Sequence, residues 1–341
     1  MSIIRQLVLV FAVLAIGFGA YWASQTKERA GDAPEIMEKV RLAVPKGIIT
    51  APVLLAQSRG LFAEAGLDVA YEDAYSSGKT AFEAMLRGEA DVSVVATAPV
   101  VANSFSRDDF FIFCTFTTSY EGVKVIARQD LGVKNASDLK GKTVGFVPGT
   151  ISQLFLDSLL AYNRILPQEV NAQPIKPQNA SALLNSGEMQ AVSIWEPHAY
   201  TALKDNQGSA VKVPSSSVYR ISICTASTKD FAAKSPNVLK KIILALKRTT
   251  AFMNDQPAQA QKELGELINM DQEPLTLFWK ETSFRLSLDQ VLLMTMENEA
   301  AWMIANRYKD DRLIPDFTRF VYCAPLEEID PQAVTIVRQQ G

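Results

Sequence analysis

The sequence predicts an α/β protein of two similarly wound lobes, and two observations lead to that prediction. From Val40 to Ala96 the chain alternates strand, helix, strand, helix and strand, which is the order of a doubly wound sheet. The same order of helix, Gly-Glu, strand and proline-bearing end returns about 100 residues later, up to Pro197. The residue match between the two copies is weak, and any α/β chain can repeat this pattern. The repeat is therefore a topological hypothesis, and the length of 341 residues suits two lobes.

The first strand and helix follow from the pattern of apolar residues in residues 40–66. Residues 40–44, VRLAV, place apolar side chains at alternate positions, as a strand does, and a turn follows at 45–47. Thr50 is a plausible start for a helix that runs to residue 66 and is broken near Gly60. Residues 67–74, LDVAYEDA, then read as a second strand.

The third strand of this lobe is predicted to lie in the interior of the sheet. Ser77 can cap a helix that Gly88 ends, and residues 91–96, DVSVVA, are apolar nearly throughout. Ligands bind beyond the carboxyl ends of strands in such sheets, which is where Thr97, Ala98 and Pro99 fall. The inward face of the helix should carry Ala81, Phe82, Met85 and Leu86.

The second half of the chain supplies the other lobe and its covering helices. Residues 143–147 read as a strand, and a helix follows from residue 151. Two extended segments, residues 110–129 and 217–231, can carry the chain from one lobe to the other. Three segments with amphipathic spacing then read as helices that cover the sheet: residues 236–254, 257–270 and 287–308.

The N-terminus has the pattern of a secretory signal or a membrane anchor. Residues 7–23 carry no charge and follow Arg5. Cleavage after Ala20 or Ala23 would put an aromatic residue at the −3 position, so the pattern favours an uncleaved transmembrane helix, followed by a polar linker at 24–39. Arg5 lies on the short N-terminal side of this hydrophobic segment, and positive charge favours the cytoplasmic side, so the rest of the chain is expected outside the cytoplasm. We therefore expect the protein in the periplasm or at the cell exterior, tethered to the membrane.

Composition and charge argue against several classes of function. The net charge of −3 and the absence of a basic run argue against binding to nucleic acid. Cys114, Cys224 and Cys323 are far apart and His198 is the single histidine, so we expect no metal site and no cofactor. Buried free thiols are the simplest interpretation of the cysteines, although one disulfide stays open. No nucleophile motif or acid–base pair accompanies His198, which favours a protein that is not an enzyme and has no catalytic residues.

Two predicted helix starts are candidate anion sites, because a helix N-terminus presents free N–H groups and the positive end of the helix dipole. Glycine next to a hydroxyl at a helix start is also common in simple capping, and no phosphate-binding loop is present. Their place after strands in both halves keeps the ligand-binding interpretation open. The first group is Gly78, Lys79 and Thr80, and the second is Gly149, Thr150 and Ile151.

Other candidate ligand residues lie at strand ends and in a connecting segment. Trp195 can form the wall of a pocket and the Glu196 carboxylate can accept a hydroxyl or an amine, although a core tryptophan beside a solvated glutamate explains the pair equally well. Tyr120 lies in the first connecting segment, where a hinge and a ligand contact would coincide. Lys46, followed by Gly47, can attract an anion after the first strand.

With these residues in view, the chain resembles bacterial extracytoplasmic solute-binding proteins of the nitrate, sulfonate, taurine and thiamine-precursor type. The resemblance runs from about residue 40 to 335. It rests on AVPKGIITAPVLLAQSRGLFAEAGLDV (43–69), GKTAFEAMLRGEADVSVVATAP (78–99), DLKGKTVGFVPGT (138–150) and LLNSGEMQAVSIWEP (183–197).

The resemblance implies a type II periplasmic-binding-protein fold, with lobe 1 at residues 40–122 and 219–341, lobe 2 at 123–218, and two crossing strands. It also implies a monomer that closes on a small solute and docks on an ABC permease. We expect the solute to be an anion or a polar heterocycle. A membrane-anchored ligand sensor is an alternative. An enzyme like the thiamine-pyrimidine synthase is a weaker one, because its cysteine-rich motif is missing. The family's ligand loops would fall on Lys46, Gly47, Gly78, Lys79, Thr80, Thr97, Ala98, Pro99, Tyr120, Gly149, Thr150, Trp195 and Glu196.

Overall fold

The computed structural model describes residues 37–72, 75–215, 219–306, 308 and 313–337. The predicted anchor at residues 1–23 and most of the predicted linker lie outside these ranges. β1 begins at Glu38, two residues before the expected start at Val40. Among the described residues no helix has the length and apolar character to cross a membrane.

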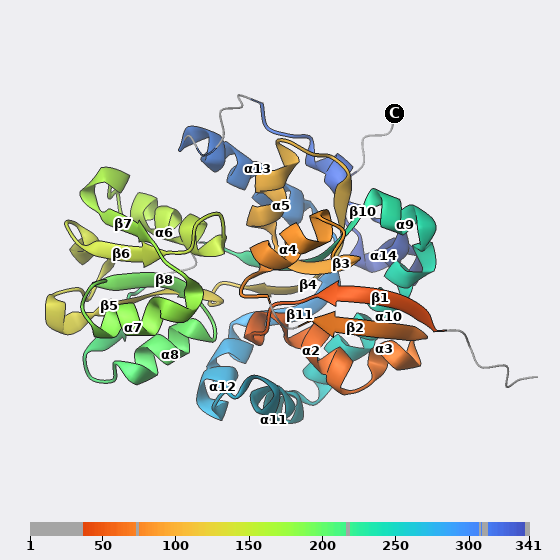
Figure 1. Ribbon diagram of the computed structural model, residues 1–341, viewed down its shortest axis with the longest axis horizontal. Helices are drawn as coiled ribbons and strands as arrows, with labels where there is room; N and C mark the ends of the chain where they lie inside the picture. Colours follow the sequence, from red (N-terminus) through yellow and green to blue (C-terminus); the bar gives the residue numbers. More distant parts are fainter. Residues whose placement is uncertain (1–36, 73–74, 216–218, 307, 309–312, 338–341) are drawn as a thin grey trace, which may run out of the picture. The chain divides into compact units, whose positions relative to one another are not determined.

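Two mixed β-sheets organise the described chain (Figure 1), and we call each sheet, with the helices packed on it, a lobe. Lobe 1 holds six strands in the order β11-β4-β10-β3-β1-β2, and lobe 2 holds five in the order β7-β6-β8-β5-β9. The strands of lobe 1 are β1 (Glu38–Ala43), β2 (Leu67–Glu72), β3 (Val92–Ala96), β4 (Phe110–Ser119), β10 (Ile221–Thr228) and β11 (Thr282–Ser287). Those of lobe 2 are β5 (Val123–Arg128), β6 (Thr143–Phe146), β7 (Asn171–Pro174), β8 (Ala191–Trp195) and β9 (Ala210–Lys212).

Both sheets are parallel on one side and antiparallel on the other, which the parallel pattern in the sequence did not show. β1 pairs in parallel with β2 and β3, whereas β10 runs antiparallel to β3 and β4. In lobe 2, β6 is parallel to β7 and β8, and β5 is antiparallel to β8. β10 and β5 are the strands that enter from the other lobe, and each runs antiparallel to its neighbours, whereas β11 is antiparallel to β4 without following a crossing.

Helices cover both faces of each sheet, as a doubly wound arrangement requires. In Figure 1, α6 lies on one face of the lobe 2 sheet and α7 and α8 on the other, while α4, α5 and α13 lie on one side of the lobe 1 sheet and α2, α3 and α12 on the other. The α-helices are α2 (Ala51–Ser58), α3 (Leu61–Glu64), α4 (Gly78–Leu86), α5 (Thr97–Ser104), α6 (Ile151–Tyr162), α7 (Ala180–Asn185), α8 (His198–Asp205), α9 (Lys229–Lys234), α10 (Pro236–Asp255), α11 (Pro257–Ile268), α12 (Gln272–Lys280), α13 (Gln290–Ala305) and α14 (Ala324–Ile329). Short 3₁₀ turns lie at Ile48–Thr50, Gln129–Leu131, Ala136–Leu139, Pro167–Glu169, Pro177–Asn179, Phe317–Phe320 and Pro331–Ala333.

Local signals place α4 and β3 as the sequence predicts. The Ser77 hydroxyl accepts a hydrogen bond from the Thr80 amide, which caps α4, and Gly88 takes a left-handed φ of 79° just after the helix ends. Phe82 and Met85 are fully buried, and every residue of β3 is buried. This helix and strand therefore bring the Ser77 end of α4 and the last residues of β3 to the same edge of the sheet.

The chain crosses between the lobes twice, and the two crossings touch. One crossing joins β4 to β5 through residues 120–122, and the other joins β9 to β10. A Cβ atom on Gly122 would lie 2.7 Å from Cδ1 of Ile221, so a larger residue here would require the Ile221 side chain to move. Each lobe therefore connects to the other through two neighbouring backbone segments.

Candidate functional site

A narrow pocket lies between the two lobes at the ends of their strands, and we call it the cleft site. The volume open to the centre of a water molecule is about 40 Å³, which is room for only a few waters. Lobe 2 contributes the start of α6 and the end of β8. The lining residues are Pro45, Lys46, Gly47, Ile49, Thr50, Ser77, Gly78, Lys79, Val94, Val95, Ala96, Pro99 and Ile223 from lobe 1, and Thr150, Ile151, Trp195 and Glu196 from lobe 2.

Two helix N-termini meet at the cleft site, one from each lobe. Ser77 caps α4, and the Thr150 hydroxyl caps α6 by accepting from the Ser152 amide at 3.2 Å. The Thr150 hydroxyl also donates to the Val147 carbonyl at 2.8 Å, so its proton is already used. The first amides of a helix have no partner within the helix, so those of Gly78 and Ile151 are the donors that the two helix starts can offer an anion.

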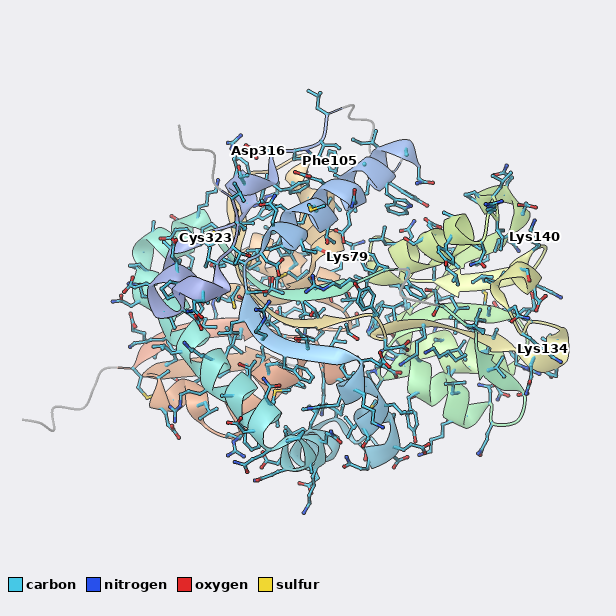
Figure 2. All side chains as sticks on the ribbon, turned by 180° about the vertical axis from the view of Figure 1, so that it is seen from behind. Lys79, Phe105, Lys134, Lys140, Asp316 and Cys323 are labelled. Carbon is cyan, nitrogen blue, oxygen red and sulfur yellow. The ribbon has the colours of Figure 1, made fainter. Side chains whose placement is uncertain are left out.

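Lys79 reaches across the cleft from lobe 1 to lobe 2. Its Nζ atom donates to the carbonyl oxygen of Pro148 at 3.4 Å, and a Cβ atom on Gly149 would lie 3.0 Å from the same Nζ. Gly149 has φ of 68°, so glycine suits both its backbone conformation and the space left by the lysine. Figure 2 shows Lys79 at the junction of the two lobes. An ammonium group held in this position contacts both lobes at once.

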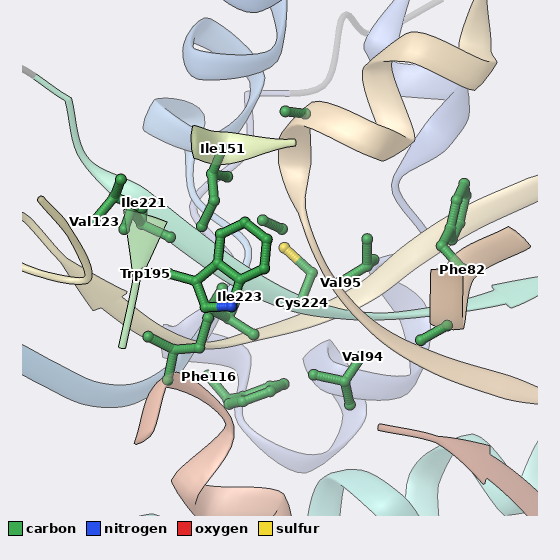
Figure 3. Close-up of a cluster of buried hydrophobic side chains, with 14 of the residues drawn as sticks. Phe82, Val94, Val95, Phe116, Val123, Ile151, Trp195, Ile221, Ile223 and Cys224 are labelled. Carbon is green, nitrogen blue, oxygen red and sulfur yellow. The ribbon is translucent and has the colours of Figure 1, made fainter. Parts of the chain in front are cut away.

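Trp195 forms the apolar wall of the cleft. Its side chain extends from the end of β8 and is 8 % exposed, and Figure 3 shows the indole close to Ile151 and Ile223. Ile223 belongs to β10 of lobe 1, so the ring packs against residues of both lobes. The indole therefore closes one side of the pocket to water.

Glu196 lines the cleft but its carboxylate already has partners. One oxygen accepts from Lys124 Nζ at 2.5 Å and the other from the Tyr200 amide at 2.9 Å. The residue is 5 % exposed, so it is neither the solvated glutamate nor the open acceptor that the sequence left as alternatives. Since this ion pair neutralises Glu196, the other charged side chains among the described lining residues are those of Lys46 and Lys79. Glu83 lies 4.0 Å from Lys79 Nζ.

The lobes also touch at Gly47 and at the outer edge of the cleft. Gly47 has an extended backbone, and a Cβ atom there would lie 3.2 Å from the backbone oxygen of Glu196 in the other lobe. On the outside, Asp271 of lobe 1 accepts from the Tyr200 hydroxyl at 2.5 Å and from Lys204 Nζ at 2.7 Å. These contacts describe a cleft whose two walls are in contact.

Several residues predicted from the sequence do not line the cleft. Thr97 is buried at the start of α5, where its hydroxyl donates to Glu299 at 2.6 Å, and Ala98 is buried beside it. The Thr80 hydroxyl donates to the Ser77 carbonyl, and Tyr120 is 44 % exposed on the crossing segment. Gly149 contacts Lys79 without lining the pocket. Their roles as ligand residues stay predictions.

The structure brings lining residues to the cleft that sequence analysis did not select. Ile223 comes from a strand far along the chain, and nothing in its neighbourhood marks it as a pocket residue. Thr50 and Ser77 were recognised only as helix starts, which is the signal that could have led to them. The other additions are Pro45, Ile49, Val94, Val95 and Ala96, which lie directly beside predicted strand ends.

None of the three cysteines is among the residues that line the cleft, although Figure 3 shows Cys224 close to the Trp195 indole. Cys114, Cys224 and Cys323 are buried and form no disulfide, which confirms the interpretation as buried free thiols. Burial raises the pKa of Cys224 to about 12 and that of Cys114 further still, so both stay protonated at neutral pH. His198 is half-buried at the start of α8, and burial lowers its pKa. Within the described ranges, no group of three or more potential ligand side chains could hold a metal ion.

The family of this chain follows from a comparison with protein-family profiles. The profile described as "NMT1/THI5 like" matches residues 49–260, which is more than half of the chain. The chain belongs to this family. Among curated proteins, one from Bacillus subtilis (strain 168), whose name assigns it to the binding of aliphatic sulfonates, is 24 % identical over 288 residues, covering 82 % of each chain.

Solved structures show which fold this family member has. The alkanesulfonate-binding protein from Xanthomonas axonopodis pv. citri, bound to MOPS, superposes with a TM-score of 0.71 at 17 % identity, covering 84 % of this chain and 98 % of that one. The periplasmic aliphatic sulphonate binding protein of Escherichia coli gives 0.70 at 17 % identity, covering 84 % and 97 %. The desulfurization enzyme DszB in complex with biphenyl-2-sulfinic acid gives 0.66 at 12 % identity, covering 86 % and 99 %. The family member therefore has the α/β periplasmic-binding-protein fold, with two mixed sheets.

Proposed function

We propose that this protein is the solute-binding component of an ABC importer and that it captures a small organic anion of the sulfonate type in the cleft site. The observation that carries the proposal is Lys79, which is held across the cleft at the point where two helix N-termini meet. Sulfonate-binding relatives with the same fold support the choice of ligand class.

The polar groups around the cleft favour an anion over an amine. Lys46 and Lys79 contribute positive charge, and the amides of Gly78 and Ile151 add the positive ends of two helix dipoles. Among the described lining residues the single carboxylate is that of Glu196, which is neutralised by Lys124. A protonated amine would therefore meet like charges and find no carboxylate without a partner. A polar heterocycle without a negative charge would leave the two lysines unused.

The shape of the cleft supports capture by closure of the two lobes. Lys79 with Pro148, Gly47 with Glu196, and Asp271 with Lys204 all join the lobes across the cleft. A ligand that contacts both walls binds the closed arrangement more tightly than an open one, and this difference drives closure. Under this proposal the lobes correspond to the predicted segments, with lobe 1 at residues 40–122 and 219–341 and lobe 2 at 123–218.

The wider setting follows from the same proposal. Periplasmic relatives support a place outside the cytoplasm, and the partner would be an ABC permease in the membrane. The hydrophobic segment 7–23 would tether the protein at the membrane surface. A membrane-anchored sensor that binds the same anion remains the second candidate, because it needs the same cleft and the same anchor.

An enzyme on this fold is the third candidate, since the desulfurization enzyme DszB shares it. Cys114 and Cys224 are buried with raised pKa values, and neither they nor Cys323 lines the cleft. His198 is not among the residues that line the cleft. The described residues thus hold no reactive pair at this site, and binding without reaction is the function that we propose.

Titration of ethanesulfonate into the full chain in detergent tests this proposal. We expect binding that weakens by at least tenfold in Lys79→Gln, about 1.4 kcal/mol, because the cross-cleft ammonium is lost. Lys280→Gln, at the far end of α12, is the matched control and should change the dissociation constant less than twofold. Equal affinity in wild type and Lys79→Gln, or no binding of ethanesulfonate at all, would contradict the proposal.

A further inference from the structure

A second cavity lies between the lobes, on the side of the crossing segments, and shares no lining residue with the cleft site. We call it the α6–α13 cavity. The volume open to the centre of a water molecule is about 290 Å³, larger than the 40 Å³ of the cleft site. Leu154 and Ser158 of α6 line it from lobe 2, while Glu299 and Trp302 of α13 line it from lobe 1. Arg220, just before β10, completes the charged lining.

Glu299 is a buried carboxylate with an unused oxygen. The residue is 2 % exposed, and its Oε1 atom accepts hydrogen bonds from the hydroxyls of Thr97 and Tyr219. Its Oε2 atom is buried and has no hydrogen-bond partner in the described part of the chain. An unpaired buried carboxylate oxygen is costly, and burial raises the pKa of Glu299 to about 7. A hydrogen-bond donor with a positive charge would satisfy this atom.

The other lining groups limit what kind of donor fits. Trp302 lines the cavity with an aromatic ring, a group that attracts an ammonium, and Tyr308 packs against that ring with 4.9 Å between the centroids. Arg220 brings a positive charge to the same cavity, and no ion pair of Arg220 is found among the described residues. A simple cation would satisfy Glu299 and be repelled by Arg220, whereas a simple anion would have the opposite problem. A molecule with both charges satisfies both side chains.

We propose that the α6–α13 cavity is a second binding site, for a small zwitterion that carries a primary ammonium group at one end and a carboxylate or sulfonate at the other. Glu299 and Trp302 hold the ammonium group, and Arg220 holds the anionic end. The proposal goes beyond the anion site in the cleft and does not depend on it. Because the cavity is lined from both lobes, its ligand also favours the arrangement in which α6 and α13 are close.

Calorimetric titration of the full chain in detergent with three probes of matched size tests the proposal. β-Alanine carries both charges, propylamine only the positive one and propionate only the negative one. We expect β-alanine to bind at least tenfold more tightly than either of the others. Failure of β-alanine to bind, or equal binding of propylamine, would overturn the zwitterion site.

Variants assign the binding to this cavity. Glu299→Gln should weaken β-alanine binding by at least tenfold, while Glu297→Gln, an exposed glutamate on the same helix, should change it less than twofold. Arg220→Gln should also weaken β-alanine binding, and it provides an independent test if Glu299→Gln folds poorly. Binding of β-alanine that survives both Glu299→Gln and Arg220→Gln would overturn the proposal.

Ethanesulfonate separates this result from the function proposed for the cleft. Glu299→Gln should bind ethanesulfonate like the wild type, which also shows that the variant is folded. Lys79→Gln should raise the dissociation constant of β-alanine less than threefold, since only one contact between the lobes is lost. If β-alanine binding instead depends on Lys79 and not on Glu299, the zwitterion occupies the cleft and the second site is wrong.

Discussion

The cleft site and the α6–α13 cavity lie about one turn apart along α6, at Ile151 and Leu154. Their buried carboxylates nevertheless differ in how many hydrogen-bond partners they have. In the cleft, Glu196 is fully paired and the lysines stand ready for an anion. In the cavity, Glu299 keeps one oxygen without a partner.

The difference shows that burial of a carboxylate does not by itself mark a ligand site. Glu196 and Glu299 are buried to a similar degree, at 5 % and 2 % exposure. Lys124 and the Tyr200 amide satisfy the first, which makes Glu196 a structural ion pair that positions the end of β8. The second has hydroxyl partners on one oxygen only. Both carboxylates are buried, but only Glu299 lacks a hydrogen bond to one oxygen. A missing hydrogen bond, and not burial, therefore indicates which carboxylate can bind a ligand.

Trp195→Ala should have the largest effect and should act on the cleft alone. Removing a buried indole leaves a cavity, which we expect to lower the free energy of unfolding by about 3–5 kcal/mol. Chemical denaturation measures this loss, and ethanesulfonate titration should show weaker binding. β-Alanine binding should stay within twofold of the wild type where the variant is folded. Equal loss of both ligands would mean that the two sites are not separate.

Glu299→Gln should change how stability depends on pH. The raised pKa of Glu299 means that the folded state binds the proton more tightly than the unfolded state, so the free energy of unfolding falls as pH rises from about 4.5 to about 7. This loss is about 3 kcal/mol at most, and the Gln variant should not show it. Thr97 and Tyr219 donate to the carboxylate, Cys224 interacts with it electrostatically, and Arg220 is the charged group that lines the same cavity.

Denaturation curves of wild type and Glu299→Gln at pH 5 and pH 8 measure that change. The variant should be the more stable protein at pH 8, and the difference should shrink at pH 5. Asp157, whose pKa burial raises to about 6, contributes a smaller slope of the same sign in both proteins. Parallel pH profiles for the two proteins would show that Glu299 does not titrate in this range.

Asp271→Asn should have the smallest effect and should not distinguish the two sites. Asp271 joins the lobes through Tyr200 and Lys204 at the exposed edge, where water screens the charges. We expect the dissociation constants of ethanesulfonate and β-alanine to rise by less than threefold each, because both sites depend on the same arrangement of the lobes. A large effect on one ligand only would show that this contact belongs to that site.

Local signals in the sequence predicted much of the fold. Ser77 caps α4, Gly88 ends it with a left-handed backbone, and the apolar run from 91 to 96 is a fully buried strand. The expected crossing segments and covering helices are also present, as β4, β10, α10, α11 and α13. Each of these features depends on residues within about two turns of one another, where capping, glycine conformation and apolar periodicity act directly.

The sequence predicted only some of the residues that line the cleft, and the differences between prediction and structure have a common cause. The sequence pointed to the starts of α4 and α6 and to Trp195, and the structure brings these together around one pocket. It also pointed to the Thr97 hydroxyl, which instead donates to Glu299, a residue 202 positions away. No local sequence pattern near Thr97 predicts a hydrogen-bond partner so distant in the chain.

The sequence by itself determined the first three strands of lobe 1, the starts of α4 and α6, and the family. The tertiary structure alone decided that Glu196 is neutralised by Lys124, that Ile223 completes the cleft, and that Glu299 is left with an unpaired oxygen. The physical reason is the range of the forces concerned. Backbone preferences and apolar periodicity act between near neighbours in the chain, whereas the charge state of a buried group depends on whichever distant side chains the fold packs against it.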